Sequence, residues 1–276
     1  MKTTAILTSR NDNYGDNLSH RVLMSLSSMI EFHDEVVFVE WKIKNNDSLF
    51  SSIKNKLPHQ GKLKYVPVYS DFLKEHYSTI NQYTMIESIA KNVAIRRASN
   101  DYIISTNIDI LVNDLDKNIL SENTFFTVPR RDIPQDLHLQ FSNYQDLHEH
   151  INRNKDSFRP KERIDSKDDI WSLINCCGDY QIGHKNVWYK MKGFEESILF
   201  GCGIDTNVMK KASFFSQIKV LDHYIFHLNH GKNSQIDSDE IQPTISNQNS
   251  IIRDFIESSN PDTWGMSDKD LPIEIL

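Results

Sequence analysis

The chain has few of the features that build disulfide scaffolds or membrane spans. Its three cysteines, Cys176, Cys177 and Cys202, show no C-x-x-C spacing and form no even set, which favours reduced thiols in a cytoplasmic protein. No apolar run approaches the roughly 20 residues that a membrane span requires. The amino terminus has only the short run A-I-L-T before charged residues begin, so we expect neither a signal peptide nor a membrane span.

The chain also has no excess of basic residues. Its 31 lysines and arginines are outnumbered by 38 acidic residues, and the net charge is −7. This sign disfavours a protein that holds nucleic acid by neutralising phosphates, so we expect no nucleic-acid partner. With 276 residues, 38% of them hydrophobic, the chain is long enough to bury a sizeable core.

The first half alternates between short apolar segments and segments with helical spacing. Apolar residues recur near the helical period over 17–32 and again over 82–98. We expect four strands around these helices, at 3–8, 34–42, 63–69 and 102–107. Alternation of this kind predicts an α/β fold with βαβ units and a largely parallel sheet.

The second half is less regular. A charged stretch at 132–170 predicts a partly helical excursion, and a short helix is expected before the tail sequence D-T-W-G-M. The remaining expected elements are strands at 123–131, 174–183 and 218–228 and helices at 185–194 and 203–214.

Polar side chains follow several of the predicted strands. Arg10 and Asp12 come after the first, Glu40 ends the second, and Asn107 and Asp109 follow the fourth. Because ligands of open α/β sheets collect beyond the carboxyl ends of the strands, these residues are expected at one edge. Asp109 could there bind a hard divalent cation through oxygen, or it could be an ordinary capping or solvated acid.

Five stretches occur in an order that resembles the nucleotide-sugar glycosyltransferases of GT-A fold, in particular a bacterial, algal and viral branch akin to family 2. They are SRNDNYG, VVFVEWK, KNVAIRRASNDYIISTNIDIL, GDYQIGHKNVWYKMKGFEE and YIFHLNHG. The resemblance covers roughly residues 3–232. It implies a single domain over 1–276, with a Rossmann-like nucleotide-binding half at 1–112 carrying a mixed central sheet. A half for the donor sugar and acceptor at 113–232 and a tail at 233–276 would follow.

The resemblance also implies a metal site. The family's Asp-x-Asp motif corresponds to Asn107 and Asp109, so a metal would depend on Asp109, while Asn107 could still bond ribose or phosphate. His227 resembles the family's third ligand and His230 follows it. Imidazole beside carboxylate suits Mn²⁺ better than Ca²⁺, and we expect Mn²⁺ or Mg²⁺. The alternatives are two ordinary polar histidines, or a phosphate contact for His230.

The catalytic base has two candidates. Asp205, at the start of a predicted helix, resembles the base of inverting members, which would take a proton from the acceptor hydroxyl; an N-cap is the alternative. Asp179 is the second choice and is implied to lie under the donor sugar. Gly178 would allow the ligand to approach the backbone closely.

The resemblance assigns a further group of residues to the nucleotide. An acid at the end of the second strand would accept the N3 hydrogen of uracil, which favours a UDP-sugar donor. The expected nucleotide-binding residues are Thr8, Arg10, Asp12, Glu40, Asn92, Asn107 and either Arg96 or, as first choice, Arg97.

These assignments predict an inverting, metal-dependent glycosyltransferase that moves a sugar from a UDP-sugar to a hydroxyl of a glycan or glycolipid acceptor. A catalytically inactive nucleotide- or sugar-binding module is one alternative, because Asn107 replaces an acid of the motif. A sugar-phosphate nucleotidyltransferase is another. That class normally has a glycine-rich basic loop after the first strand, whereas this loop has one glycine and one arginine.

Overall fold

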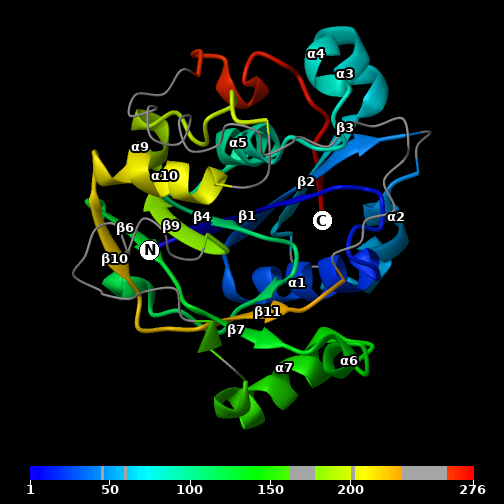
Figure 1. Cartoon of the computed structure of the whole chain (residues 1–276), viewed down its shortest axis with the longest axis vertical. Coiled ribbons are helices and arrows are strands. Elements are labelled where there is room, and N and C mark those ends of the chain that lie inside the picture. Colours follow the sequence, from blue (N-terminus) through cyan, green and yellow to red (C-terminus); the bar gives the residue numbers. More distant parts are fainter. Residues whose placement is uncertain (45–46, 59–60, 159, 162–177, 200–202, 232–259) are drawn as a thin grey trace.

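A computed structural model describes residues 1–44, 47–58, 61–158, 160–161, 178–199, 203–231 and 260–276. Within these residues the chain forms two sheets (Figure 1). In spatial order the larger sheet contains β10 (Gln217–Val220), β6 (Thr124–Thr127), β9 (Tyr180–His184), β4 (Tyr102–Thr106), β1 (Thr3–Ser9), β2 (Glu35–Ile43), β3 (Leu63–Tyr69) and β12 (Glu274–Ile275). The smaller contains β5 (Ile110–Leu111), β11 (Ile225–Leu228), β7 (Arg130–Ile133) and β8 (Pro160–Lys161).

The four strands of the first half are parallel, as their alternation with helices predicts. β1 and β2 are buried along their whole length because both faces of the sheet are covered. Successive side chains of β2 enter different cores, with Val37 and Val39 on one face and Val36 and Phe38 on the other. β9 runs antiparallel to β4 and β6, which makes the central sheet mixed.

Helices cover both faces of the larger sheet (Figure 1). One face packs against α5 (Glu87–Arg97), α9 (Lys185–Lys190) and α10 (Ile204–Ser213). The other packs against α1 (Leu18–Phe32) and α2 (Leu49–Ile53). The sequence prediction missed two short helices after β3, α3 (Ser70–His76) and α4 (Ser78–Asn81). Single 3-10 turns lie at Lys54–Lys56, Lys117–Ile119, Lys155–Ser157 and Trp264–Met266.

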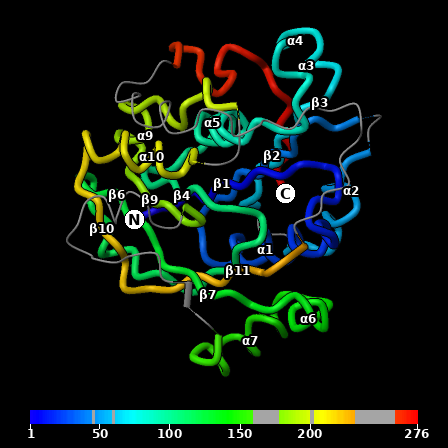
Figure 2. Tube along the Cα trace, viewed as in Figure 1, coloured from blue at the N-terminus to red at the C-terminus, as the bar shows by residue number. Residues whose placement is uncertain are grey.

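The smaller sheet has its own helical cover. Figure 2 shows α6 (Gln135–His138) and α7 (Tyr144–Asn154) together beside β7 and β11. α7 buries Leu147 and Ile151 in a separate apolar cluster that also contains Phe226 of β11. The charged excursion predicted at 132–170 is therefore helical in its first part, and its amphipathic helix closes this sheet.

Two strands predicted as single elements are each divided between the two sheets. The stretch 123–131 forms β6 and then β7, and the stretch 218–228 forms β10 and then β11. Pro129 interrupts the first because proline has no N–H to donate to a ladder. The second breaks opposite it, where the Ile225 amide donates to the Pro129 carbonyl. This paired crossing from sheet to sheet places β11 beside β5, the short strand that follows β4.

None of the helices in the described ranges combines the length and the apolar character needed to cross a membrane. The three cysteines and the short helix expected before D-T-W-G-M lie outside the described residues, as does most of the tail from residue 233.

Candidate functional site

The turn after β4 carries the first two residues of the site. β4 ends at Thr106, so Asn107 and Asp109 lie just beyond the strand, and the chain then enters the two-residue strand β5. Asp109 therefore does not interrupt a buried strand. It lies at the carboxyl edge of the larger sheet, where the order of strands predicts ligand-binding groups.

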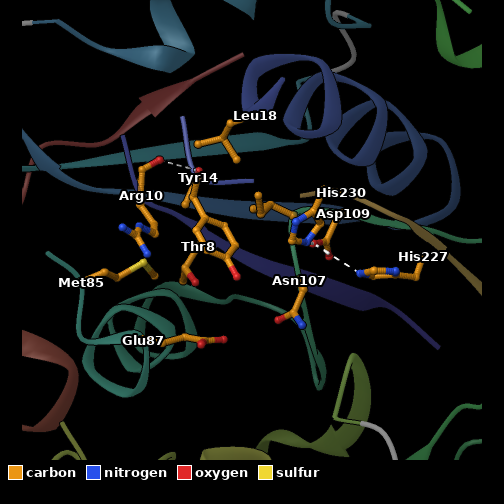
Figure 3. Close-up of a pocket in the computed structure, with 12 residues that line it drawn as sticks. Thr8, Arg10, Tyr14, Leu18, Met85, Glu87, Asn107, Asp109, His227 and His230 are labelled. Carbon is orange, nitrogen blue, oxygen red and sulfur yellow. Dashed lines mark hydrogen bonds and ion pairs between the residues drawn. The ribbon is translucent and has the colours of Figure 1, made fainter. Parts of the chain in front are cut away.

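Pairing between β5 and β11 brings His227 to Asp109. His227 is the register partner of Ile110, the residue after Asp109, and the Leu228 amide donates to the Asp109 carbonyl. The Nε2 atom of His227 lies 3.6 Å from Oδ2 of Asp109, and Nε2 of His230 lies 3.1 Å from the same oxygen. Figure 3 shows both imidazoles directed at this carboxylate.

The loop after β1 packs against this cluster. Gly15 has a φ of 71°, and a Cβ atom there would overlap Nδ1 of His230, so glycine is required for the close approach. The Gly231 amide donates to the Gly15 carbonyl, and the Tyr14 ring meets the His230 ring edge-on with centroids 5.4 Å apart. The loop and the end of β11 thus form one packed unit.

Asp109 is held ionised by its neighbours. Burial alone would raise the pKa of Asp109, but hydrogen bonds and charge from His227 and His230 outweigh it and hold the pKa well below its usual range. Burial would likewise lower the pKa of His227, and the bond to Asp109 reverses this and raises it. The guanidinium of Arg21, which is fully buried on α1, lies 3.5 Å from the same Asp109 oxygen.

The cluster fits a divalent transition-metal ion. Within the described residues, one oxygen of Asp109 and one nitrogen each of His227 and His230 lie within 4.8 Å of one another. The second oxygen, Oδ1 of Asp109, is buried with no hydrogen-bond partner among those residues, so a ligand atom there is left unused. One carboxylate and two imidazoles are a donor set that suits Mn²⁺ or a similar cation better than Ca²⁺.

The cluster forms one wall of a cavity of about 260 Å³ (Figure 3). Thr8 and Arg10 line it from the end of β1, and Asn107 lines it beside Asp109. The sequence prediction assigned all of these to the ligand. It missed Tyr14, Leu18, Met85 and Glu87, which also line the cavity. Tyr14 carried a signal in the polar loop S-R-N-D-N-Y-G, where it is the one aromatic residue and stacks under Arg10 with 4.8 Å from guanidinium to ring centroid.

Glu40, which is predicted to contact the base, is not among the residues that line this cavity. It is completely buried, and both its oxygens accept hydrogen bonds from the start of α2. The Leu49 and Phe50 amides donate at 2.7 and 3.1 Å, and the Ser48 and Tyr65 hydroxyls donate at 2.8 and 2.7 Å. Glu40 therefore caps α2, satisfying amides that have no partner within the helix.

Asn92, Arg97 and Asp12, which are also predicted to contact the nucleotide, have protein partners in the structure. Asn92 is completely buried and exchanges hydrogen bonds with the backbone of Phe194. Arg97 donates to four backbone carbonyls, three of them in the carboxyl-terminal segment. Asp12 pairs with Arg10 and accepts a bond from the Tyr14 amide, so it orders the loop that lines the cavity.

The two candidate bases are connected to Asn107, Asp179 directly and Asp205 through Lys91. Asp179 precedes β9 and accepts a hydrogen bond from Asn107 at 3.0 Å and another from Arg130. Asp205 lies in the first turn of α10, and its carboxylate is 3.8 Å from the buried ammonium of Lys91. In the structure the group that approaches Gly178 closely is the Asp205 carboxylate, which a Cβ atom at position 178 would overlap.

No protein-family model matches the chain, and no curated protein matches its sequence. Solved structures do. The crystal structure of GalNAc-T7 with UDP, GalNAc and Mn²⁺ aligns with a TM-score of 0.56 at 10% identity, covering 89% of this chain and 45% of that one. Residues 1–349 of S. aureus TarS align at 0.49, with 15% identity and coverage of 82% and 60%. The mannosyltransferase PcManGT from Pyrobaculum calidifontis in complex with GDP-Man and Mn²⁺ aligns at 0.48, with 13% identity and coverage of 82% and 56%.

The likeness to GalNAc-T7 shows a shared fold, so the chain has the GT-A fold that its sequence predicts. The chain spans 45–60% of the length of these three structures.

Proposed function

We propose that the protein is a metal-dependent, inverting glycosyltransferase that moves a sugar from a UDP-sugar to a hydroxyl of a glycan or glycolipid acceptor. The observation that carries this proposal is the convergence of Asp109, His227 and His230 at the wall of a cavity beyond the carboxyl ends of β1 and β4. Such a wall can bind a nucleoside diphosphate beside a bound cation. GalNAc-T7, which shares the fold, was crystallised with UDP and Mn²⁺.

In this proposal Asp109, His227 and His230 hold the cation. When bound, a divalent cation neutralises negative charge on the departing diphosphate. Arg10 and Thr8 face the same cavity and supply a charged and a neutral donor for phosphate or ribose oxygens. Tyr14 offers a ring against which a uracil can pack. Glu40, which accepts hydrogen bonds from the start of α2, takes no part, so the preference for UDP rests on the cavity and not on that acid.

Asp205 is the proposed base. As the acceptor oxygen bonds to the anomeric carbon and the bond from that carbon to the diphosphate oxygen breaks, the hydroxyl proton passes to the Asp205 carboxylate. Lys91, fully buried and 3.8 Å away, places a positive charge beside that carboxylate. Asp179, which accepts bonds from Asn107 and Arg130, is proposed to orient hydroxyls of the donor sugar.

The test is a calorimetric titration of UDP with and without Mn²⁺, followed by an assay of UDP release from a panel of UDP-sugars. We expect binding that requires Mn²⁺ and turnover with at least one donor. Binding of UDP without turnover of any donor would favour a catalytically inactive module instead. No binding of UDP at any Mn²⁺ concentration would contradict the proposal.

A further inference from the structure

The side-chain amide of Asn107 connects two groups of opposite charge. Its Oδ1 accepts a hydrogen bond from the Lys91 ammonium at 3.1 Å, and its Nδ2 donates to Oδ1 of Asp179 at 3.0 Å. The two partners come from α5 and from the start of β9, so the amide joins elements far apart in the sequence. This orientation of the amide is the one that satisfies both neighbours, because an ammonium only donates and a carboxylate only accepts.

Both partners of Asn107 are themselves fixed. Lys91 is completely buried and pairs with Glu87 at 2.9 Å. Asp179 receives its second bond from Arg130. The Nε atom of Arg130 lies 3.1 Å from Asp132.

The polar contacts continue from Asp132 to the metal cluster. Oδ1 of Asp132 lies 3.4 Å from Nδ1 of His227, whose other nitrogen faces Asp109. A continuous series of polar contacts therefore runs from α5 through Asn107 and Asp179 to the imidazole of His227.

A carboxylate could not replace the amide in this series. An aspartate at position 107 could accept the bond from Lys91, but its other oxygen would then lie about where Nδ2 now meets Asp179, at 3.0 Å from a second carboxylate oxygen. Two like charges at that separation, in a largely buried site, repel strongly. The amide removes this repulsion and adds a hydrogen bond.

We infer that Asn107 is a positioning residue that orients Asp179, and that its amide is required there because it must accept from Lys91 and donate to Asp179 at once. The asparagine is therefore a functional choice and not the remnant of a lost metal ligand. The inference rests on the proposed function for the role of Asp179 toward the donor sugar, but the hydrogen-bond requirement itself does not.

A double-mutant cycle tests this inference through an exchange of the two side chains. Asn107→Asp places two carboxylates together. Asp179→Asn puts an amide NH₂ group opposite either the NH₂ group of Asn107 or the guanidinium of Arg130, so two donors face one another. The double variant restores complementarity, because Asp at 107 accepts from Lys91 and from Asn at 179, whose oxygen accepts from Arg130. We expect each single change to raise KM for the UDP-sugar, and the double variant to recover at least about tenfold relative to the product of the single effects.

Two further measurements separate positioning from other roles. The Kd for Mn²⁺ at saturating UDP should change little in the cycle, since Asn107 is not assigned to the metal. The thermal midpoint should fall in both single variants and recover in the double variant. Asn118→Asp, which adds the same charge at an exposed position, is the control and should change neither quantity.

The inference is overturned if Asn107→Asp binds donor as the wild type does, if it lowers the Mn²⁺ requirement, or if the single losses simply multiply in the double variant. If the wild type binds no UDP, the proposed function fails, but the cycle in thermal midpoints still decides whether the amide is required.

Discussion

Nε2 of His230 lies 3.1 Å from Oδ2 of Asp109, although the two residues are far apart in the sequence. The carboxylate that the fold places under both histidines also keeps a buried oxygen without a hydrogen-bond partner among the described residues. Among the three proposed ligands, Asp109 is therefore the residue whose substitution should lower the affinity for a cation most.

Asp109→Asn should abolish most Mn²⁺-dependent binding of UDP, because it removes the one negative charge of the proposed ligand set. Loss of an outer partner of a metal ligand typically costs ~10–100-fold in affinity, so loss of the ligand itself should cost about 100-fold or more. Calorimetric titration of Mn²⁺ at saturating UDP measures this. Glu35→Gln is the matched control, since Glu35 is an equally buried acid at the start of β2, on the opposite edge of the larger sheet. Equal Mn²⁺ affinity in both variants would contradict the ligand assignment.

Asp205→Asn should lower kcat by ~10²–10⁴-fold, the usual contribution of a positioned base, and leave the affinity for UDP nearly unchanged. Steady-state kinetics with the preferred donor and acceptor measure this. Asp146→Asn changes an acid in the first turn of α7 and controls for loss of a favourable helix-end charge. Near-normal turnover in the Asp205 variant would place the base elsewhere, and a selective collapse of kcat in Asp179→Asn would point to Asp179.

Glu40→Gln should destabilise the protein without weakening UDP binding. An amide at this position places a donor where α2 presents donors, and an unsatisfied buried group costs about 1–3 kcal/mol. Urea unfolding measures the loss of stability. Ser48→Ala, which removes one hydroxyl from the same cap, should show a smaller loss of the same kind. A Glu40 variant that keeps its stability but loses UDP would restore the acid to the nucleotide site.

His33 should make the protein sensitive to acid. Burial lowers the pKa of His33 from 6.5 to about 3, so between these values the unfolded chain takes up a proton that the folded one does not. This residue therefore costs nothing above pH 6.5, and its effect lowers stability by up to about 1.4 kcal/mol per pH unit as the pH falls toward 3.

The free energy of unfolding measured at pH 6, 5 and 4 tests the role of His33. In His33→Gln the free energy of unfolding should fall less steeply with decreasing pH than in the wild type, and the difference in slope should correspond to about one proton. Thr3→Val removes a 3.1 Å hydrogen bond to the His33 ring but keeps the ring, so it should retain the wild-type slope. Parallel slopes in the wild type and in His33→Gln would show that another group controls the acid response.

The first half of the fold could be predicted from sequence because its signals are local. β3 has the predicted bounds, and β1 and α1 differ from theirs by one residue at one end. Apolar runs between polar turns are sufficient for strands that are buried on both faces. The division of 123–131 and 218–228 between two sheets could not be read in this way. It depends on which distant segments pair, and Pro129 was the one local sign of it.

The candidate site shows the same division. Asp109 was singled out by its place after a strand, and the resemblance to a known family, not spacing, added His227 and His230. Glu40 and Asn92, both predicted to contact the nucleotide, have protein partners in the structure, because a strand end or helix position does not say where a side chain turns. Each side chain accepts a hydrogen bond from a backbone amide that packs against it, at the start of α2 for Glu40 and at residue 194 for Asn92. Glu87 carried no signal beyond its charge.

The proposed cation ligands do not come from one layer of the molecule. Asp109 lies in the turn between β4 of the large sheet and β5 of the small one, whereas His227 belongs to β11, which pairs with β5 in the small sheet. An ion bound by both Asp109 and His227 would link the two sheets at this point. Metal binding would then stabilise the contact between the two sheets. Removal of the metal by a chelator would weaken the packing of the small sheet and α7 before it affects the nucleotide-binding half.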